Sequence, residues 1–183
     1  MKKTTHIGNI TLVINNSLDR KNPCILLGRK KLKRKSDDKR KRKRIGMGRW
    51  VPPGGATEKS DKSQKHAAQR ELYEETGLLF PIRAFRKVGI LKGYLDSTTV
   101  PTWLVHIYIV NTDSSNQTFV VNEEYEEMRW LSLAKLPFEN MLQGDVEWLP
   151  RIAGGEMLSI KLVATENADK AFSVKIVPIK SFN

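Results

Sequence analysis

The sequence of 183 residues is poor in the side chains that form crosslinks or bind transition metals. Cys24 is its only cysteine, so no disulfide can form within the chain and a scaffold held by disulfides is excluded. A cysteine-based zinc site is excluded for the same reason. Histidine is scarce as well, so any metal would need carboxylate ligands. The three histidines are His6, His66 and His106.

Long apolar runs are also missing. No stretch approaches the roughly 18 apolar residues of a transmembrane helix. Residues 10–14 form an apolar stretch that is far too short for the core of a signal peptide. We therefore expect no membrane partner and a reducing, cytoplasmic location. A nuclear location is the alternative if the basic segment described next acts as an import signal.

The positive charge is concentrated in one segment. The chain carries 32 Lys and Arg against 20 Asp and Glu, a net charge of +12. Residues 30–44 hold eleven of the basic residues and two Asp, so they carry +9 and the remaining chain only +3. Such a run repels itself, and we expect a flexible insertion at about residues 30–45. It is either a nucleic-acid tether or import patch, densest at residues 39–44, or a solvated insertion between two strands. The last is favoured because basic runs often lack a selected partner.

The remaining sequence predicts one folded domain, and 39% hydrophobic residues suffice for a core. Alternating or β-branched stretches predict strands at residues 7–14, 24–28, 86–91, 103–110, 128–133, 158–164 and 173–178. A helix is expected at residues 61–76, with Gly77 as its left-handed cap, and a turn and helix at residues 137–151. Residues 46–55, with four Gly and two Pro, predict a shaped loop. The fold class is therefore α/β or α+β, a sandwich around a mixed sheet.

Three carboxylates are expected on one side of the first helix. Residues three and four apart share a helix face, so Glu71, Glu74 and Glu75 crowd together while Leu72 points to the core. Their mutual repulsion costs free energy unless a cation is bound. Hard oxygen ligands without His or Cys suit Mg²⁺, with Mn²⁺ as a substitute, and Mg²⁺ commonly shares its coordination with substrate phosphates. The alternative is a solvated acidic helix face.

The order of these residues resembles the Nudix box, Gly-x5-Glu-x7-Arg-Glu-U-x-Glu-Glu-x-Gly-U, where U is apolar. Two departures are visible: Asp61 replaces the first glutamate of the box, and residues 62–69 are one residue longer than the pattern. The extra residue precedes or opens the helix, so it need not disturb the three glutamates. The matching positions are Gly55, Arg70, Glu71, Leu72, Glu74, Glu75, Gly77 and Leu78.

Membership of the Nudix hydrolase superfamily implies an α/β/α sandwich with a mixed sheet, in which the box forms a loop–helix–loop. The resemblance implies Glu74 and Glu75 as principal metal ligands and Glu71 as a further ligand or general base. The carbonyl of Gly54 completes the coordination, and Arg70 orients a glutamate. The family cleaves a nucleoside diphosphate linked to another group. Glu71, Glu74 and Arg70 are thus the catalytic candidates.

A later carboxylate often joins the metal cluster in this family. The acidic stretch before the strand expected at residue 128 supplies four candidates. Glu127, next to that strand, is the first choice and Glu124 the second. The four are Glu123, Glu124, Glu126 and Glu127.

The resemblance extends to the MutT-homologue branch, the oxidised-purine nucleoside triphosphatases. It rests on residues 46–50 before the double glycine, residues 127–131, residues 136–141, Asp145 and residues 148–150. The branch implies a Mg²⁺-dependent pyrophosphohydrolase that converts oxidised purine nucleotides such as 8-oxo-dGTP to monophosphate and pyrophosphate, and we expect a monomer. A nucleotide is then the expected partner, and nucleic acid is not required.

The expected base pocket departs from the animal enzyme of that branch. Val51 replaces an Asn that contacts the purine, Leu142 replaces a stacking aromatic, and Gly144 replaces the first of two acids that read the purine edge. The second acid remains as Asp145. Loss of such groups relaxes the choice of base. The candidate substrate-binding residues are Asp145, Trp148, Trp50, Leu142 and Val51.

Two other functions stay open. One is hydrolysis of another nucleoside diphosphate derivative: a dinucleoside polyphosphate, a nucleotide sugar or capped RNA. The other is a non-catalytic, nucleic-acid-binding module on a Nudix scaffold, which the three intact glutamates disfavour.

Overall fold

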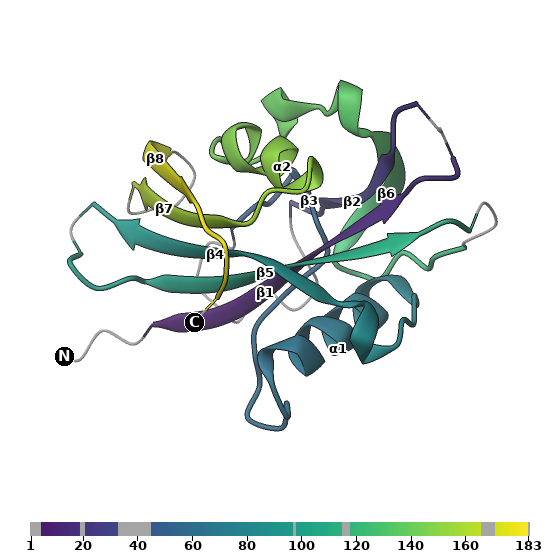
Figure 1. Cartoon of the computed structure of the whole chain (residues 1–183), viewed down its shortest axis with the longest axis horizontal. Helices are drawn as coiled ribbons and strands as arrows, with labels where there is room; N and C mark the ends of the chain where they lie inside the picture. Colours follow the sequence, from purple (N-terminus) through teal and green to yellow (C-terminus); the bar gives the residue numbers. More distant parts are fainter. Residues whose placement is uncertain are drawn as a thin grey trace.

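A computed structural model describes residues 5–18, 21–32, 45–96, 98–114, 118–165 and 171–182, with the side chains of residues 171 and 172 left aside. Most of the predicted basic insertion, residues 33–44, lies outside the described residues. The elements form one mixed sheet with a helix on each side (Figure 1). The predicted fold class, an α/β/α sandwich around a mixed sheet, is thereby confirmed.

The strands follow the order β3-β2-β1-β5-β4-β7-β8, and β6 pairs with the other edge of β2. Two pairs are parallel, β1 with β5 and β4 with β7, and the other pairs are antiparallel. The strands are β1 (His6–Asn15), β2 (Cys24–Lys30), β3 (Trp50–Val51), β4 (Arg86–Leu95), β5 (Trp103–Thr112), β6 (Tyr125–Ser132), β7 (Leu158–Ala164) and β8 (Ala171–Pro178).

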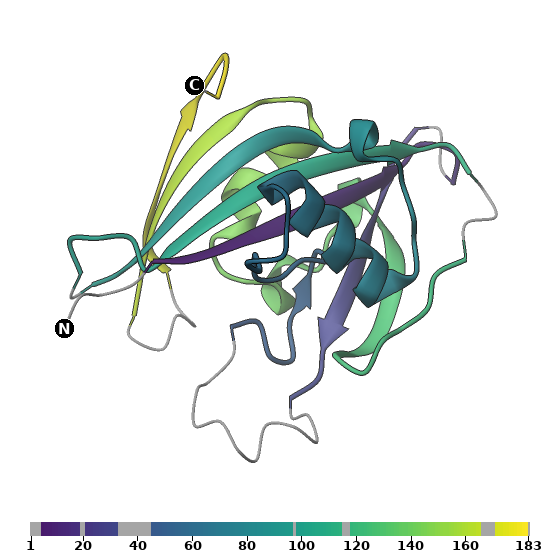
Figure 2. The same cartoon turned by 90° about the horizontal axis from the view of Figure 1, so that it is seen from below.

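The central strands contribute side chains to a hydrophobic core on each face of the sheet, which explains their continuous apolar runs. In β1, Leu12 and Ile14 point to the face covered by α2 (Asp145–Ala153), whereas Val13 points to the face covered by α1 (Gln64–Thr76). We call these two sets of buried residues the α2-side core and the α1-side core. Figure 2, seen from below, shows α1 in front of the sheet and α2 behind it.

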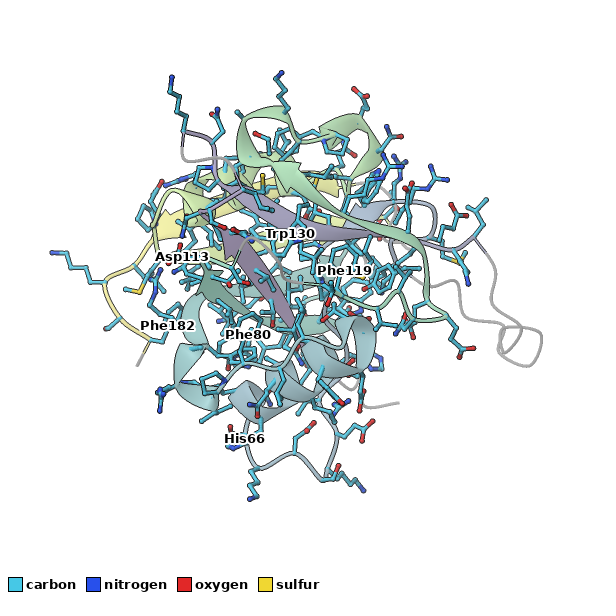
Figure 3. The ribbon with its side chains drawn as sticks, turned by 90° about the vertical axis from the view of Figure 1, so that its right-hand side faces the viewer. His66, Phe80, Asp113, Phe119, Trp130 and Phe182 are labelled. Atoms are coloured by element: carbon cyan, nitrogen blue, oxygen red, sulfur yellow. The ribbon has the colours of Figure 1, made fainter. Side chains whose placement is uncertain are left out.

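The α1-side core is closed by aromatic side chains beyond the helix. The rings of Phe119 and Trp130 pack edge to face with centroids 6.5 Å apart, and both lie against this core together with Phe80 (Figure 3). None of the described helices has the length and apolar character needed to cross a membrane.

Helix α1 begins three residues later than predicted. Its N-cap is Ser63, whose hydroxyl accepts from the His66 amide, and Asp61 lies in the turn before it. Gly77 ends the helix in the left-handed conformation, φ 70°, as predicted. Strand β4 is four residues longer than predicted and β6 begins three residues earlier. The two-residue strand β3 was not predicted, because it lies within the glycine-rich loop.

The segment predicted as a turn and helix at residues 137–151 contains two elements. A short 3-10 turn, η4 (Phe138–Asn140), precedes α2, which runs on to Ala153. The final two strands pair antiparallel as expected, with Leu158 opposite Pro178. Two further 3-10 turns are η2 (Ile82–Ala84) and η3 (Leu133–Lys135).

Candidate active site

The glycine loop lies along the first half of β1, and Gly54 is required for this approach. The amide of Asn9 donates to the carbonyl of Gly55, and that of Thr11 to the carbonyl of Pro53, both at 2.9 Å. Gly54 has φ 153°, and a Cβ atom there would lie 2.2 Å from the carbonyl oxygen of Asn9. A larger residue would therefore push the loop off the strand.

Glu75 is a buried carboxylate that joins three elements. Its side chain reaches from the last turn of α1, and the residue is only 4% exposed. Oε2 accepts from the Gly54 amide at 2.7 Å and from the Tyr125 hydroxyl at 2.8 Å. Burial raises the pKa of the Glu75 carboxyl to about 7, opposed by the charge of Lys30 and by these two hydrogen bonds.

Glu71 stands one turn earlier on the same helix face. A Cβ atom at Gly55 would lie 2.5 Å from the Glu71 carboxylate, so the glycine leaves the space that this carboxylate fills. Burial raises the pKa of Glu71, while the neighbouring Arg70 lowers it. The charge of Glu71 raises the pKa of Glu75 further by repulsion, and the charges of Glu74 and Glu58 do the same to the pKa of Glu71, which a bound cation would relieve.

Arg70 ties the loop before the helix to the helix itself. Its Nε and Nη2 donate to the two oxygens of Asp61 at 3.1 and 3.0 Å, and Nη2 also donates to the carbonyl of Ala56. Nη1 donates to Glu71 at 3.1 Å and to Glu74 at 2.9 Å. The hydrogen bond from Arg70 lowers the pKa of Asp61. The shorter acid therefore still meets the arginine, despite the extra residue in the box.

A cleft opens between the glycine loop, α1 and the end of β2. Glu71 and Glu75 line it, whereas Glu74 does not, because its exposed carboxylate is held by Arg70. The residues that line it are Lys30, Ile45, Gly54, Gly55, Ala56, Glu71, Glu75 and Glu124.

The structure brings Glu124, the second choice for the late carboxylate, to this cleft, whereas the first choice, Glu127, does not line it. Glu124 precedes β6 and lies 4.0 Å from the Lys30 ammonium. Glu127 lies within β6 opposite Arg29, and its carboxylate pairs with Arg129 and approaches Arg29. A register shift of the β2–β6 pair between Arg29 and Lys30 separates Glu127 from the cleft residues, and the Glu127 carboxylate lies at Arg29 and Arg129 instead.

The other two acidic candidates also lie elsewhere. Glu126 forms an ion pair with Arg29, and Glu123 is exposed in the turn before β6. Neither lines the cleft.

A second, mostly apolar pocket of about 170 Å³ lies on the α2 side of the sheet. Of the predicted base-site residues, Leu142, Asp145 and Trp148 line it, and Trp103 and Leu91 form its apolar wall. Ile45 lines both this pocket and the carboxylate cleft, so the two cavities meet at that residue.

Asp145 is the one acidic group in the lining of this pocket. The residue is 5% exposed, and Oδ1 accepts from the Trp148 indole at 3.1 Å. Burial raises the pKa of the Asp145 carboxyl to about 7, because no cation offsets the loss of solvent. Near neutral pH the group is therefore part acid and part carboxylate.

Trp50 and Val51, which were also predicted to bind substrate, do not line this pocket. Strand β3 pairs with β2 through Arg29 and Gly28, and this pairing buries both side chains. Trp50 belongs to the α2-side core and Val51 to the α1-side core.

Sequence reasoning missed Lys30 in the cleft lining and Tyr125 behind it. Lys30 stood at the start of a basic run and was counted only as charge, yet it lines the cleft and its Nζ lies 5.9 Å from the Tyr125 ring centroid. The hydroxyl of Tyr125 holds Glu75. Simple alternation along β6 from Met128 and Trp130 would point Tyr125 away from the α1-side core, so only the register shift opposite Arg29 and Lys30 reveals its inward position.

The donor chemistry of the cleft fits a divalent cation. Gly54, Glu71, Glu75 and Glu124 supply hard oxygen atoms, and the missing Cβ of Gly55 makes room for one of the carboxylates. Among the described residues, no three His, Cys, Asp or Glu side chains already gather closely enough to form a metal site.

The fold thus places a mixed sheet between two helices, and it brings a glycine loop together with the buried carboxylate of Glu75 on α1. A family model of the NUDIX domain matches residues 7–152, so the chain belongs to the Nudix family. Its members are metal-dependent hydrolases of phosphoanhydride bonds, and this chain is a hydrolase of that class. No curated protein sequence matches it.

Three solved structures illustrate the likeness. A MutT protein from Bacillus halodurans has a TM-score of 0.66 at 18% identity, with 93% of this chain and 97% of that chain covered. A MutT/nudix family protein from Enterococcus faecalis gives 0.56 at 14% identity over 72% of this chain, which spans 45% of that one. A bifunctional NMN adenylyltransferase/ADP ribose pyrophosphatase from Francisella tularensis, complexed with AMP and a Mn ion, gives 0.59 at 21% identity, covering 83% and 42%. At these identities the likeness concerns the fold.

The hydroxyl of Tyr125 is expected to stabilise the folded protein through Glu75. Replacement by Phe removes one hydrogen bond to a buried carboxylate, which should lower the free energy of unfolding by about 1.5–3 kcal/mol. Urea unfolding in EDTA at about pH 8, where Glu75 is mostly ionised, measures this loss. Tyr73→Phe on the exposed side of α1 is the matched control and should change stability by less than about 0.5 kcal/mol. Equal losses in both variants would contradict the assigned role of Tyr125.

Proposed function

We propose that this Nudix hydrolase is a Mg²⁺-dependent nucleoside triphosphate pyrophosphohydrolase that converts oxidised purine nucleotides, such as 8-oxo-dGTP, to monophosphate and pyrophosphate. The observation that carries the proposal is the junction at Ile45, where a carboxylate cleft suited to a metal–diphosphate meets an apolar pocket of about 170 Å³. One nucleotide can span the two, with its base in the pocket and its phosphates in the cleft.

The phosphate half of the site is assigned as follows. Gly54, Glu71 and Glu75 would hold the cation, and Glu124 would take the place predicted for Glu127. A divalent cation held there would supply positive charge opposite the diphosphate and would lower the pKa of a bound water molecule. Lys30 adds one positive charge in the same cleft, which favours binding of the phosphate chain.

The remaining box residues act through orientation. Arg70 contacts Glu71 and Glu74 with separate hydrogen bonds from one nitrogen, so it fixes both carboxylates relative to the glycine loop. Glu71 is then the candidate general base, because its pKa is raised by burial and it lines the cleft. Glu74 does not line the cleft. It either holds Arg70 in position, or it leaves Arg70 and becomes a further ligand of the cation.

A nucleoside diphosphate derivative other than an oxidised triphosphate is the second candidate. The pocket has one acidic group and no stacking aromatic at Leu142, so its hydrogen-bonding demand on a base is small. Such a pocket also accommodates a dinucleoside polyphosphate, a nucleotide sugar or the cap of an RNA.

The proposal predicts the ranking of a substrate panel. Purified protein is incubated with Mg²⁺ and, separately, 8-oxo-dGTP, 2-oxo-dATP, dGTP, a diadenosine polyphosphate, ADP-ribose and capped RNA, and anion exchange separates the products. We expect pyrophosphate release from the oxidised triphosphates with kcat/KM at least about tenfold above that for dGTP. Preferred cleavage of ADP-ribose, the dinucleotide or the cap would contradict the proposed substrate while leaving the phosphoanhydride chemistry in place.

Asp145 is expected to make KM depend on pH. Below its pKa of about 7 the neutral acid offers one donor and one acceptor to a purine edge, and above it the group only accepts. The KM for 8-oxo-dGTP should therefore rise from about pH 6 to about pH 8.5 in the wild type. Asp145→Asn keeps one hydrogen-bond donor and one acceptor but does not titrate. Its KM should therefore change less with pH than that of the wild type.

Asp145→Ala removes both hydrogen bonds and should raise KM about tenfold or more at every pH. Glu147→Gln, on the exposed side of the same helix, is the control and should follow the wild type. An unchanged KM in Asp145→Ala would remove Asp145 from substrate binding.

A further inference from the structure

In the part of the chain that the structure describes, no helix covers the α1 side of β4, β7 and β8. Helix α1 packs against β1 and β5. The buried apolar residues of β4 and β7, and those of β8 that pack on a core, belong to the α2-side core, and none of these strands contributes to the α1-side core. Figure 2 shows α1 crossing the sheet away from these three strands. The opposite face of β4, β7 and β8 is therefore a sheet surface that none of the described helices covers, and we call it the open face.

Three lysines form a row across the open face. Lys92 on β4 is the direct register partner of Lys161 on β7, which is in turn the partner of Lys175 on β8. All three side chains are exposed. Since neighbouring strands are about 4.8 Å apart, the row spans roughly 10 Å. Like charges directly opposite one another destabilise a sheet, so this arrangement has an energetic cost.

The cost is not offset by acidic neighbours. Within the described part of the chain, none of the three ammonium groups has a carboxylate oxygen within 4.0 Å. The nearest acid along β4 is Asp96, which follows the strand. Lysine on an edge strand protects against aggregation, and this explains Lys175 on β8. It does not explain Lys92 and Lys161, whose strands are paired on both sides.

An aromatic ring lies beside the row. Tyr94 is two residues after Lys92 and so shares its face of β4, and the Lys161 ammonium lies 4.9 Å from its ring centroid. The hydroxyl residues Ser159 and Ser173 stand on the same face of β7 and β8, beside Lys161 and Lys175. At the far end, Phe182 of the C-terminal tail lies under the Lys87 ammonium (Figure 3). The open face thus combines a line of unpaired cations with a partly exposed ring.

We propose that the open face docks a single-stranded nucleic acid. Lys92, Lys161 and Lys175 contact successive phosphates, and Tyr94 stacks on a base. Surfaces that bind single strands without sequence preference combine backbone-tracking cations with aromatic rings, and flat sheets with exposed aromatics serve this purpose. A row about 10 Å long suits a chain of phosphates better than one isolated phosphate.

This surface is separate from the nucleotide site. Gly93, Leu162 and Ala164 alternate with the residues of the open face and line the apolar pocket on the opposite side of the sheet. The proposal therefore goes beyond the proposed function, and hydrolysis of small nucleotides does not depend on it.

Fluorescence anisotropy with labelled oligo(dT) of about 20 nucleotides, in EDTA, tests the proposal. The full chain carrying Lys92→Gln, Lys161→Gln and Lys175→Gln is compared with a control carrying Lys59→Gln, Lys62→Gln and Lys135→Gln. The control lysines are exposed outside the open face, so both variants lose the same net charge and keep the basic segment intact. We expect about a tenfold loss of affinity, and a salt slope shallower by about 2, only in the first variant.

Tyr94→Leu should weaken binding about tenfold, whereas Tyr94→Phe should bind like the wild type. Unchanged melting temperature and triphosphate hydrolysis exclude misfolding as the cause. Equal binding by the two lysine variants, or no effect of Tyr94→Leu, would overturn the proposal. So would a loss confined to binding of phosphatidylserine–phosphatidylcholine vesicles, which would assign the face to a lipid surface.

Discussion

The burial of the Glu75 carboxylate is the constraint on which the site depends. A carboxylate taken from water is costly unless it is hydrogen-bonded, and this one is satisfied by groups from two other parts of the fold. The Gly54 amide and the Tyr125 hydroxyl both donate to Oε2, so α1, the glycine loop and the start of β6 must meet at one point. Removal of either donor leaves this buried charge with one hydrogen bond fewer to compensate it. The fold therefore positions the site through the groups that hold this charge.

Arg70 provides the second fixed point. It spans the loop at Asp61 and Ala56 and the helix at Glu71 and Glu74, so it sets the distance between the two segments. This explains why the box tolerates a shorter acid together with one more residue. Arg70 requires the two carboxylate oxygens of Asp61 within reach of its guanidinium group. The hydrogen bond from the Glu58 amide to Asp61 holds the carboxylate in that position.

Much of this could be predicted from the sequence, because the box is a local pattern. Helix periodicity and Gly77 define α1, and the box order places Glu71 and Glu75 next to a glycine loop. The features of the site that could not be predicted depend on contacts between distant segments. The choice between Glu124 and Glu127 depends on where β6 begins and on a register shift between Arg29 and Lys30. Trp50 and Val51 form a two-residue strand within the glycine-rich loop, and the pairing of this strand with β2 buries them. The lysine row on the open face becomes visible only once the register of β4, β7 and β8 is known.

The central claim is that Glu71 and Glu75, joined by Glu124, hold a divalent cation in the cleft beside the glycine loop. Calorimetric titration of Mn²⁺ into the protein without nucleotide tests it most directly, with Glu75→Gln, Glu124→Gln and Glu127→Gln compared with the wild type. The account predicts that the first two variants bind Mn²⁺ at least about tenfold more weakly, since each loses an anionic ligand, while Glu127→Gln binds as the wild type does. Weakened binding in Glu127→Gln, with Glu75→Gln unaffected, would contradict it.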